Sequence, residues 1–116
     1  MHNFRQLQIW KEGMVMAKQV YLLLAKFPSS EKFGLVSQIS RCAVSVPSNI
    51  AEGSSRSSYK EFAYFLSIAL GSLFELETQL LLAIELDIVK ENEMESIISG
   101  IIQLQKKISA FKKTLK

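Results

Sequence analysis

The hydrophobic residues of this chain recur at spacings of three and four for most of its length. Between about Phe4 and Phe27 they form two adjacent stripes: Leu7, Trp10, Met14, Ala17, Tyr21 and Leu24, and Ile9, Gly13, Met16, Val20, Leu23 and Phe27. Such spacings place residues on one face of an α-helix. The doubled stripe predicts a helix whose apolar face is wider than a single helix–helix seam requires. Pro28 ends it, because proline disfavours α geometry in the residue before it.

Three further helices follow from the same periodicity. The second starts at about Glu31 or Leu35 and runs to Glu52, and the third runs from about Tyr59 to Leu86. The fourth carries apolar residues at helical spacing from Met94 to Leu115. Long helices and short connections predict one domain over residues 1–116, an all-α up-down-up-down four-helix bundle with shallow crossing angles.

Local signals mark where these helices begin and end. Ser58 with Glu61 three residues later has the pattern of a capping box, and Asn92 with Glu95 is a second plausible cap. Gly53 suits the position just past the second helix, where a left-handed backbone is often needed.

Pro47 lies inside the second helix, where proline removes a backbone donor and costs roughly 3 kcal/mol. Val46 and Ile50 continue the stripe of Leu35, Ile39 and Cys42 in phase across it. A break would lose that phase, so we predict one helix that is kinked at Pro47.

Polar residues gather near this proline. Ser45, Asn49 and Glu52 share one helix face by their spacing, and the third helix offers Ser72 and Glu75 three positions apart. With Arg41 they form a predicted polar cluster that links the second and third helices and fixes their register. A ligand or metal pocket is the functional alternative.

Composition and charge add two expectations about partners. Hydrophobic residues make up 48% of the chain and the mean hydropathy is +0.17, which favours subunit association to cover apolar surface.

The net charge of +3 is unevenly divided: +4 over residues 1–56, −6 over 57–99 and +5 over 100–116. The basic ends point to an anionic partner such as RNA or DNA. The candidate phosphate-binding residues are Lys106, Lys107, Lys112, Lys113 and Lys116 on the fourth helix, and Arg5, Lys11 and Lys18, which by spacing share an outer face of the first. The alternative is that these residues only solubilise the surface.

Two segments resemble a known family. "FGLVSQISRCAVSVPSNIAEGSSR" and "KEFAYFLSIALGSLFELETQL" are similar to the signature of the four-helix-bundle 23S ribosomal RNA intervening-sequence proteins. Cys42 departs from it, since alanine is usual there. The positions that match are Leu35, Gln38, Arg41, Ser45, Asn49, Ile50, Ala51, Glu52, Gly53 and Arg56 in the first segment, and Glu61, Phe62, Phe65, Leu66, Ala69, Gly71, Ser72, Glu75 and Glu77 in the second.

The resemblance implies a left-handed bundle that assembles as a homopentamer. Many genes of the family lie inside intervening sequences of large-subunit ribosomal RNA genes. Related accessory proteins of diversity-generating retroelements bind nucleic acid and act with a reverse transcriptase. The resemblance therefore implies that this chain has RNA, DNA or a protein such as a reverse transcriptase as its partner.

We do not expect this chain to catalyse a reaction. The one histidine, His2, lies outside the predicted helices, so the Glu-x-x-His pairs of a di-iron bundle are missing, and Glu75 and Glu77 cannot point the same way. There is no glycine-rich phosphate loop or G-x-S-x-G motif, and we expect no enzyme activity, cofactor or metal. Cys42 lies on an apolar stripe and is expected in the core.

The remaining expectations concern surface and location. Exposed aromatic residues for stacking on bases are not evident, so any binding should depend on phosphates and salt rather than on sequence. No signal peptide or membrane span is recognisable, which favours a cytoplasmic protein that makes no contact with a membrane. The leading hypothesis is an oligomeric nucleic-acid-binding bundle, and the alternative is a protein–protein adaptor without nucleic-acid affinity.

Overall fold

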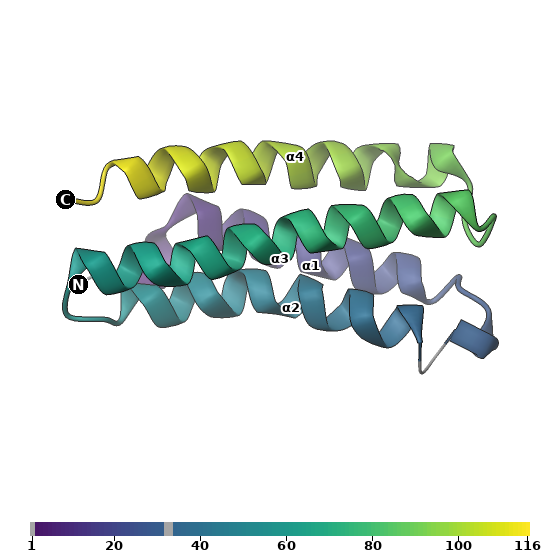
Figure 1. The fold of residues 1–116 in the computed structure, drawn as a ribbon, viewed down its shortest axis with the longest axis horizontal. Coiled ribbons are helices and arrows are strands. Elements are labelled where there is room, and N and C mark those ends of the chain that lie inside the picture. The colour runs from purple at the N-terminus through teal and green to yellow at the C-terminus, as the bar shows by residue number, and fades with distance from the viewer. Residues whose placement is uncertain (1, 32–33) are drawn as a thin grey trace.

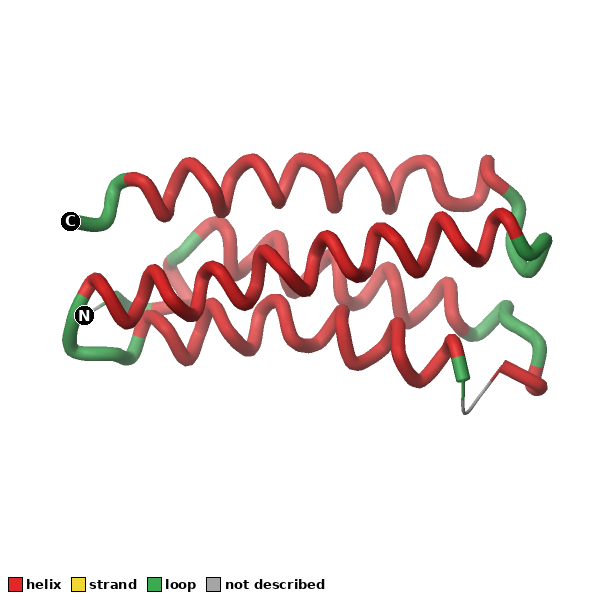
Figure 2. The backbone as a smooth tube through the Cα atoms, in the orientation of Figure 1, coloured by secondary structure: helices red, strands yellow, loops and turns green. Residues whose placement is uncertain are grey.

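The computed structural model describes residues 2–31 and 34–116, which form four α-helices: α1 (Gln8–Leu24), α2 (Leu35–Ser54), α3 (Tyr59–Glu85) and α4 (Glu91–Lys113). Single 3₁₀ turns, η1 (Phe4–Gln6) and η2 (Ser29–Glu31), precede α1 and α2. The chain runs up and down along a long axis of 44 Å, with its loops at the two ends (Figures 1 and 2). Each helix packs on the next, and α4 returns to α1. The predicted all-α four-helix bundle is confirmed.

One stripe from each helix fills the core. From α1 it is the second of the two stripes, and Val20 in its middle is fully buried. The first stripe of α1 is only partly covered: Leu24 is buried and Leu7, Trp10 and Ala17 pack against the core, but Met14 is 47% and Tyr21 53% exposed. The wide apolar face predicted for this helix is therefore present, and it is exposed at Met14 and Tyr21.

α2 continues through Pro47 without interruption, as the periodicity predicted. Val46 and Ile50 on either side are fully buried, and Pro47 is buried too. A Cβ added to Gly13 of α1 would lie 3.5 Å from the Cβ of Pro47, so the two backbones approach closely here. The bend itself stays a prediction.

The predicted start of the first helix at Phe4 is wrong. Leu7 is extended, with φ −75° and ψ 125°, and separates the 3₁₀ turn at Phe4 from α1. The side chain of Asn3 accepts a hydrogen bond from the backbone N–H of Arg5 at 3.2 Å, which stabilises the separate turn. This local bond competes with helix extension.

The helix caps are partly as predicted. Ser58 Oγ accepts the backbone N–H of Glu61 at 3.1 Å, which confirms the start of α3. The cap at Asn92 is wrong, because α4 already begins at Glu91, after Lys90. There the carboxylate of Glu93 accepts the backbone N–H of Lys90 at 3.3 Å, and this hydrogen bond and the one from Lys26 lower its pKa.

Gly53 has a different role from the one predicted. It lies inside the last turn of α2, and no glycine in residues 2–31 and 34–116 has a positive φ. A Cβ at Gly53 would come within 2.7 Å of Phe65 Cβ and 2.9 Å of Phe62 Cδ1. Glycine is needed because α3 crosses at this point with two phenylalanine side chains.

Replacing Gly53 by alanine therefore tests the closeness of α2 and α3. We expect Gly53→Ala to lower the free energy of unfolding by about 1–3 kcal/mol, because an extra methyl group overpacks the contact. Gly100→Ala is the matched control: its Cβ meets nothing within 4 Å, and alanine should stabilise the helix by roughly 0.5–1 kcal/mol. Urea denaturation followed by circular dichroism measures both, and equal stability of the two variants would contradict the packing argument.

Candidate functional site

A chain of hydrogen bonds joins α2 to α3 beside Pro47. The hydroxyls of Ser45 and Ser72 lie 2.8 Å apart. Asn49 Nδ2 donates to the carbonyl oxygen of Ser45 at 2.8 Å and to its Oγ at 2.9 Å. These three predicted cluster residues are brought together, and their half-buried polar groups are satisfied by each other. The arrangement is that of a structural contact between helices.

The other three predicted members of the polar cluster take no part in these hydrogen bonds. Glu52 points away and pairs with Arg56, four residues later, at 2.9 Å, where water can solvate the carboxylate. Arg41 is exposed. Glu75 reaches α2 at a different residue, accepting a hydrogen bond from the thiol of Cys42 at 3.4 Å.

The expected core position of Cys42 is confirmed, because the residue is buried. Burial raises the pKa of its thiol to about 11, and the hydrogen bond to Glu75 and the charge of that carboxylate add to the shift. At neutral pH the thiol is therefore protonated and a poor nucleophile. This residue contributes packing to the bundle.

The thiol allows a test of the core by labelling. We expect iodoacetamide to modify Cys42 at pH 8 only as fast as the bundle opens, and at the ordinary rate of a free cysteine in urea. The pKa of the Cys42 thiol is higher in the folded chain than in the unfolded chain. The contribution of this thiol to the free energy of unfolding is therefore complete below pH 9, and it is lost as the pH rises towards 11. Mass spectrometry of the labelled protein checks this, and fast labelling under native conditions would contradict the burial.

The hydrogen bonds among Ser45, Asn49 and Ser72 can be tested by substitution. Asn49→Leu removes the donors to Ser45 and should lower the free energy of unfolding by about 1–3 kcal/mol. Gln38→Leu, at an exposed position of the same helix, is the control and should change stability little. Thermal melting measures both. Unchanged melting with lost binding of RNA would show instead that Asn49 belongs to a binding site.

The predicted basic residues divide into several groups. Lys106 and Lys113 line a groove between α3 and α4, and Lys107 pairs with Glu12 of α1 at 2.8 Å. Lys112 is half-buried and Lys116 is exposed beyond the helix end.

The basic residues near the N-terminus are further divided. Lys11 and Lys18 are exposed on α1. Arg5 does not share their helix face, because it lies in η1 with its guanidinium 5.1 Å from the ring centre of Phe4.

An exposed aromatic ring lies in the same groove as Lys106 and Lys113. Phe74 is 53% exposed and lines this space of about 500 Å³ with Leu70 and Ser109. At one side Gln105 Nε2 donates to Glu77 Oε1 at 2.8 Å, which fixes α4 against α3. The expectation that no aromatic residue is exposed for stacking is therefore wrong at this position. The available signal was that Phe74 directly follows the core residue Leu73 and so turns outward.

His2 and the carboxylates form no metal site in the described part of the chain. The imidazole ring of His2 packs against the rings of Phe62 and Phe111, whose centres are 5.1 Å and 5.9 Å from its own. Among residues 2–31 and 34–116, no group of three or more His, Cys, Asp or Glu side chains is placed to hold a metal ion.

Comparison with known proteins relates the whole fold to one family. Residues 5–110 match the family model described as 23S rRNA-intervening sequence protein. A crystal structure from Bacteroides thetaiotaomicron, of a protein with unknown function from the S23 ribosomal protein family, superposes with a TM-score of 0.84 at 25% sequence identity. The alignment covers 90% of this chain and 98% of that one. No curated protein gives a significant match.

Proposed function

The chain belongs to the family of 23S rRNA-intervening sequence proteins, and we propose that it is a non-enzymatic, homo-oligomeric bundle that binds the backbone of RNA or DNA. The observation that carries the proposal is the groove in which Lys106 and Lys113 flank the exposed ring of Phe74. A homopentamer is the assembly that the family resemblance favours.

The groove offers both kinds of contact that single-stranded nucleic acid uses. Lysine ammonium groups replace counterions along the phosphates, which makes binding strong at low salt and weak at high salt. An exposed aromatic ring stacks on unpaired bases, at roughly 1–3 kcal/mol per base, with little preference for sequence. Lys106 and Lys113 are seven residues apart, so about 10 Å of α4 separates them, enough to flank a strand.

A protein–protein adaptor is the second candidate. The segment 57–99 has a net charge of −6, and many large hydrophobic side chains are exposed, both of which favour protein partners. A reverse transcriptase is the kind of partner that the related accessory proteins suggest. Capture of one protein partner that resists nuclease treatment would favour this function.

Neutralising the groove tests nucleic-acid binding directly. We expect Lys106→Gln with Lys113→Gln to weaken binding of a fluorescent single-stranded RNA about tenfold or more, and to reduce the slope of log K against log salt by about 1.4, since two phosphate contacts are lost. Fluorescence anisotropy at several salt concentrations gives both values. Lys26→Gln with Lys90→Gln, which removes the same charge at the other end of the bundle, is the control.

Phe74→Ala in the same titration separates stacking from charge. It should weaken single-stranded RNA and leave duplex RNA unchanged, whereas Leu82→Ala, at another exposed position of α3, should weaken neither. If wild-type protein binds no RNA at low salt, the adaptor becomes the better proposal.

A further inference from the structure

A planar cation and two aromatic rings lie together at the surface where α2 ends and α3 begins. The guanidinium carbon of Arg56, in the loop after α2, is 4.7 Å from the ring centre of Phe65. The rings of Tyr64 and Phe65 meet edge to face, with centres 5.4 Å apart and planes at 79°. We call these three residues the Arg56 platform. It is separate from the groove at Phe74 and joins a different pair of helices.

Arg56 is held in place on this platform by two contacts. Its Nη2 donates to Glu52 Oε2 at 2.9 Å, and the ring of Phe65 lies beneath its guanidinium. The carboxylate of Glu52 already offsets the positive charge, so Arg56 attracts a phosphate less than an unpaired cation would. The flat guanidinium is still accessible, since 40% of the side chain is exposed. A planar group fixed in this way is pre-organised to stack on another planar group.

Tyr64 extends the platform towards solvent. This side chain is 62% exposed, whereas Phe65 beside it is half-buried. Lys60 is also exposed, and it lies four residues earlier and therefore on the same face of α3 as Tyr64. Aromatic rings and guanidinium planes are the surfaces on which proteins stack unpaired bases, and lysines contact the phosphates beside them. The chemistry of the platform thus fits a single-stranded nucleic acid.

The platform and the groove at Phe74 are within reach of one strand. Phe74 follows Tyr64 by ten residues, which correspond to about 15 Å along α3 and a rotation of about 80° around it. Stacked nucleotides rise about 3.4 Å each, so about four to five of them cover this distance.

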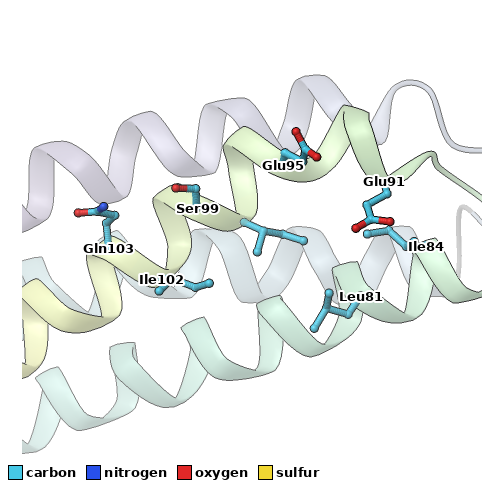
Figure 3. Close-up of a pocket in the computed structure, with 8 residues that line it drawn as sticks. Leu81, Ile84, Glu91, Glu95, Ser99, Ile102 and Gln103 are labelled. Atoms are coloured by element: carbon cyan, nitrogen blue, oxygen red, sulfur yellow. The ribbon is translucent and has the colours of Figure 1, made fainter.

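Charge favours the platform end of the bundle for such a strand. The end of α4 lies beside the start of α3 (Figure 1), where the ring centres of Phe111 and Phe62 are 5.6 Å apart. Lys113, two residues after Phe111, is therefore at the same end as the platform. At the other end, a separate groove between α3 and α4 is lined by the carboxylates of Glu91 and Glu95 (Figure 3). These carboxylates repel phosphates, so the strand leaves the groove at Phe74 towards the start of α3.

We propose that the Arg56 platform is a second base-stacking site, and that one nucleic-acid strand runs from the groove at Phe74 across α3 to this platform. The inference rests on the proposed function and deepens it, because it assigns an unpaired base to Arg56 and Tyr64 and makes single strands the substrate class. In a duplex the bases stack on each other and are not available to either site.

Two substitutions test the platform. Tyr64→Ala should weaken binding of a single-stranded RNA of about ten nucleotides about fivefold or more, because one stacked base is lost, and it should leave duplex RNA unchanged. Arg56→Lys keeps the charge but loses the flat guanidinium, so it should weaken the same RNA about threefold or more without changing the slope of log K against log salt. Fluorescence anisotropy at several salt concentrations gives the affinities and the slope.

Leu82→Ala and Arg41→Lys are the matched controls. Leu82 follows Tyr64 by eighteen residues, or five full turns, so it occupies the same face of α3 and is 46% exposed. Arg41 is an exposed arginine nearer the start of α2. Neither control should change the affinity for RNA, and circular dichroism should show the same helix content in all four variants.

Photo-crosslinking locates the strand directly. The same RNA is prepared with a single 5-iodouracil, which couples on irradiation to an aromatic ring that it stacks on. With the iodouracil near one end of the RNA we expect coupling to Tyr64 or Phe65, and with the iodouracil several nucleotides away we expect coupling to Phe74. Tandem mass spectrometry of the digested complex identifies the coupled residue.

The second site and the proposed function fail in different ways. Binding that needs Lys106 and Lys113 but is unchanged in Tyr64→Ala, or coupling at Phe74 alone, rejects the second site and leaves the proposed function intact. Full affinity in Arg56→Lys shows that only charge matters there, which also rejects stacking. If the wild-type protein binds no single-stranded RNA at low salt, the proposed function and this inference are both wrong.

Discussion

The close approach of α2 to α3 determines how the rest of the bundle is placed. Small residues line this contact: a Cβ at Gly53 would collide with Phe62 and Phe65, and Ser45 hydrogen-bonds Ser72 across it. Close backbones allow many dispersion contacts, and the hydroxyl pair is satisfied only in one register. With α2 and α3 fixed, α1 and α4 pack on their remaining apolar sides, and the grooves along both pairs follow from that geometry.

The core takes up only part of the apolar surface that the sequence supplies. α1 leaves Met14 and Tyr21 of its first stripe exposed, and α3 keeps leucine and aromatic side chains on its outer sides. A four-helix bundle gives each helix two neighbours, so an apolar arc wider than those two contacts must reach solvent or another molecule. At about 25 cal/mol per Å², covering this surface supplies a driving force that no further folding within one chain can provide.

The sequence predicted the features that depend on periodicity. The four helices, the buried stripe across Pro47 and the core position of Cys42 follow from spacings of three and four, which a core enforces. The helix ends were predicted less well, because local hydrogen bonds decide them: the backbone N–H of Arg5 donates to Asn3 before α1, and that of Lys90 donates to Glu93 at the start of α4. In the turn between α3 and α4, Asp87 has a φ of 57°, which no pattern of apolar residues reports.

The candidate site was predicted only in part for a related reason. Ser45, Asn49 and Ser72 meet because helical spacing places them on facing sides, but Glu52 finds Arg56 in solvent, and a carboxylate with such a partner does not enter a half-buried cluster. Residue type also misleads at Phe74. An aromatic residue in a periodic helix is usually assigned to the core, and its exposure depends on how close α4 lies, which is a tertiary property.

Charge is divided along the helix pair formed by α3 and α4. Glu91 and Glu95 line one groove beside α3, near the start of α4, and Lys106 and Lys113 line another near its end. Phosphate contacts weaken steeply with salt because counterions are released, whereas the burial of apolar side chains does not depend on ion pairs. Apolar contacts between subunits of the proposed homo-oligomer would therefore persist at salt concentrations that release nucleic acid.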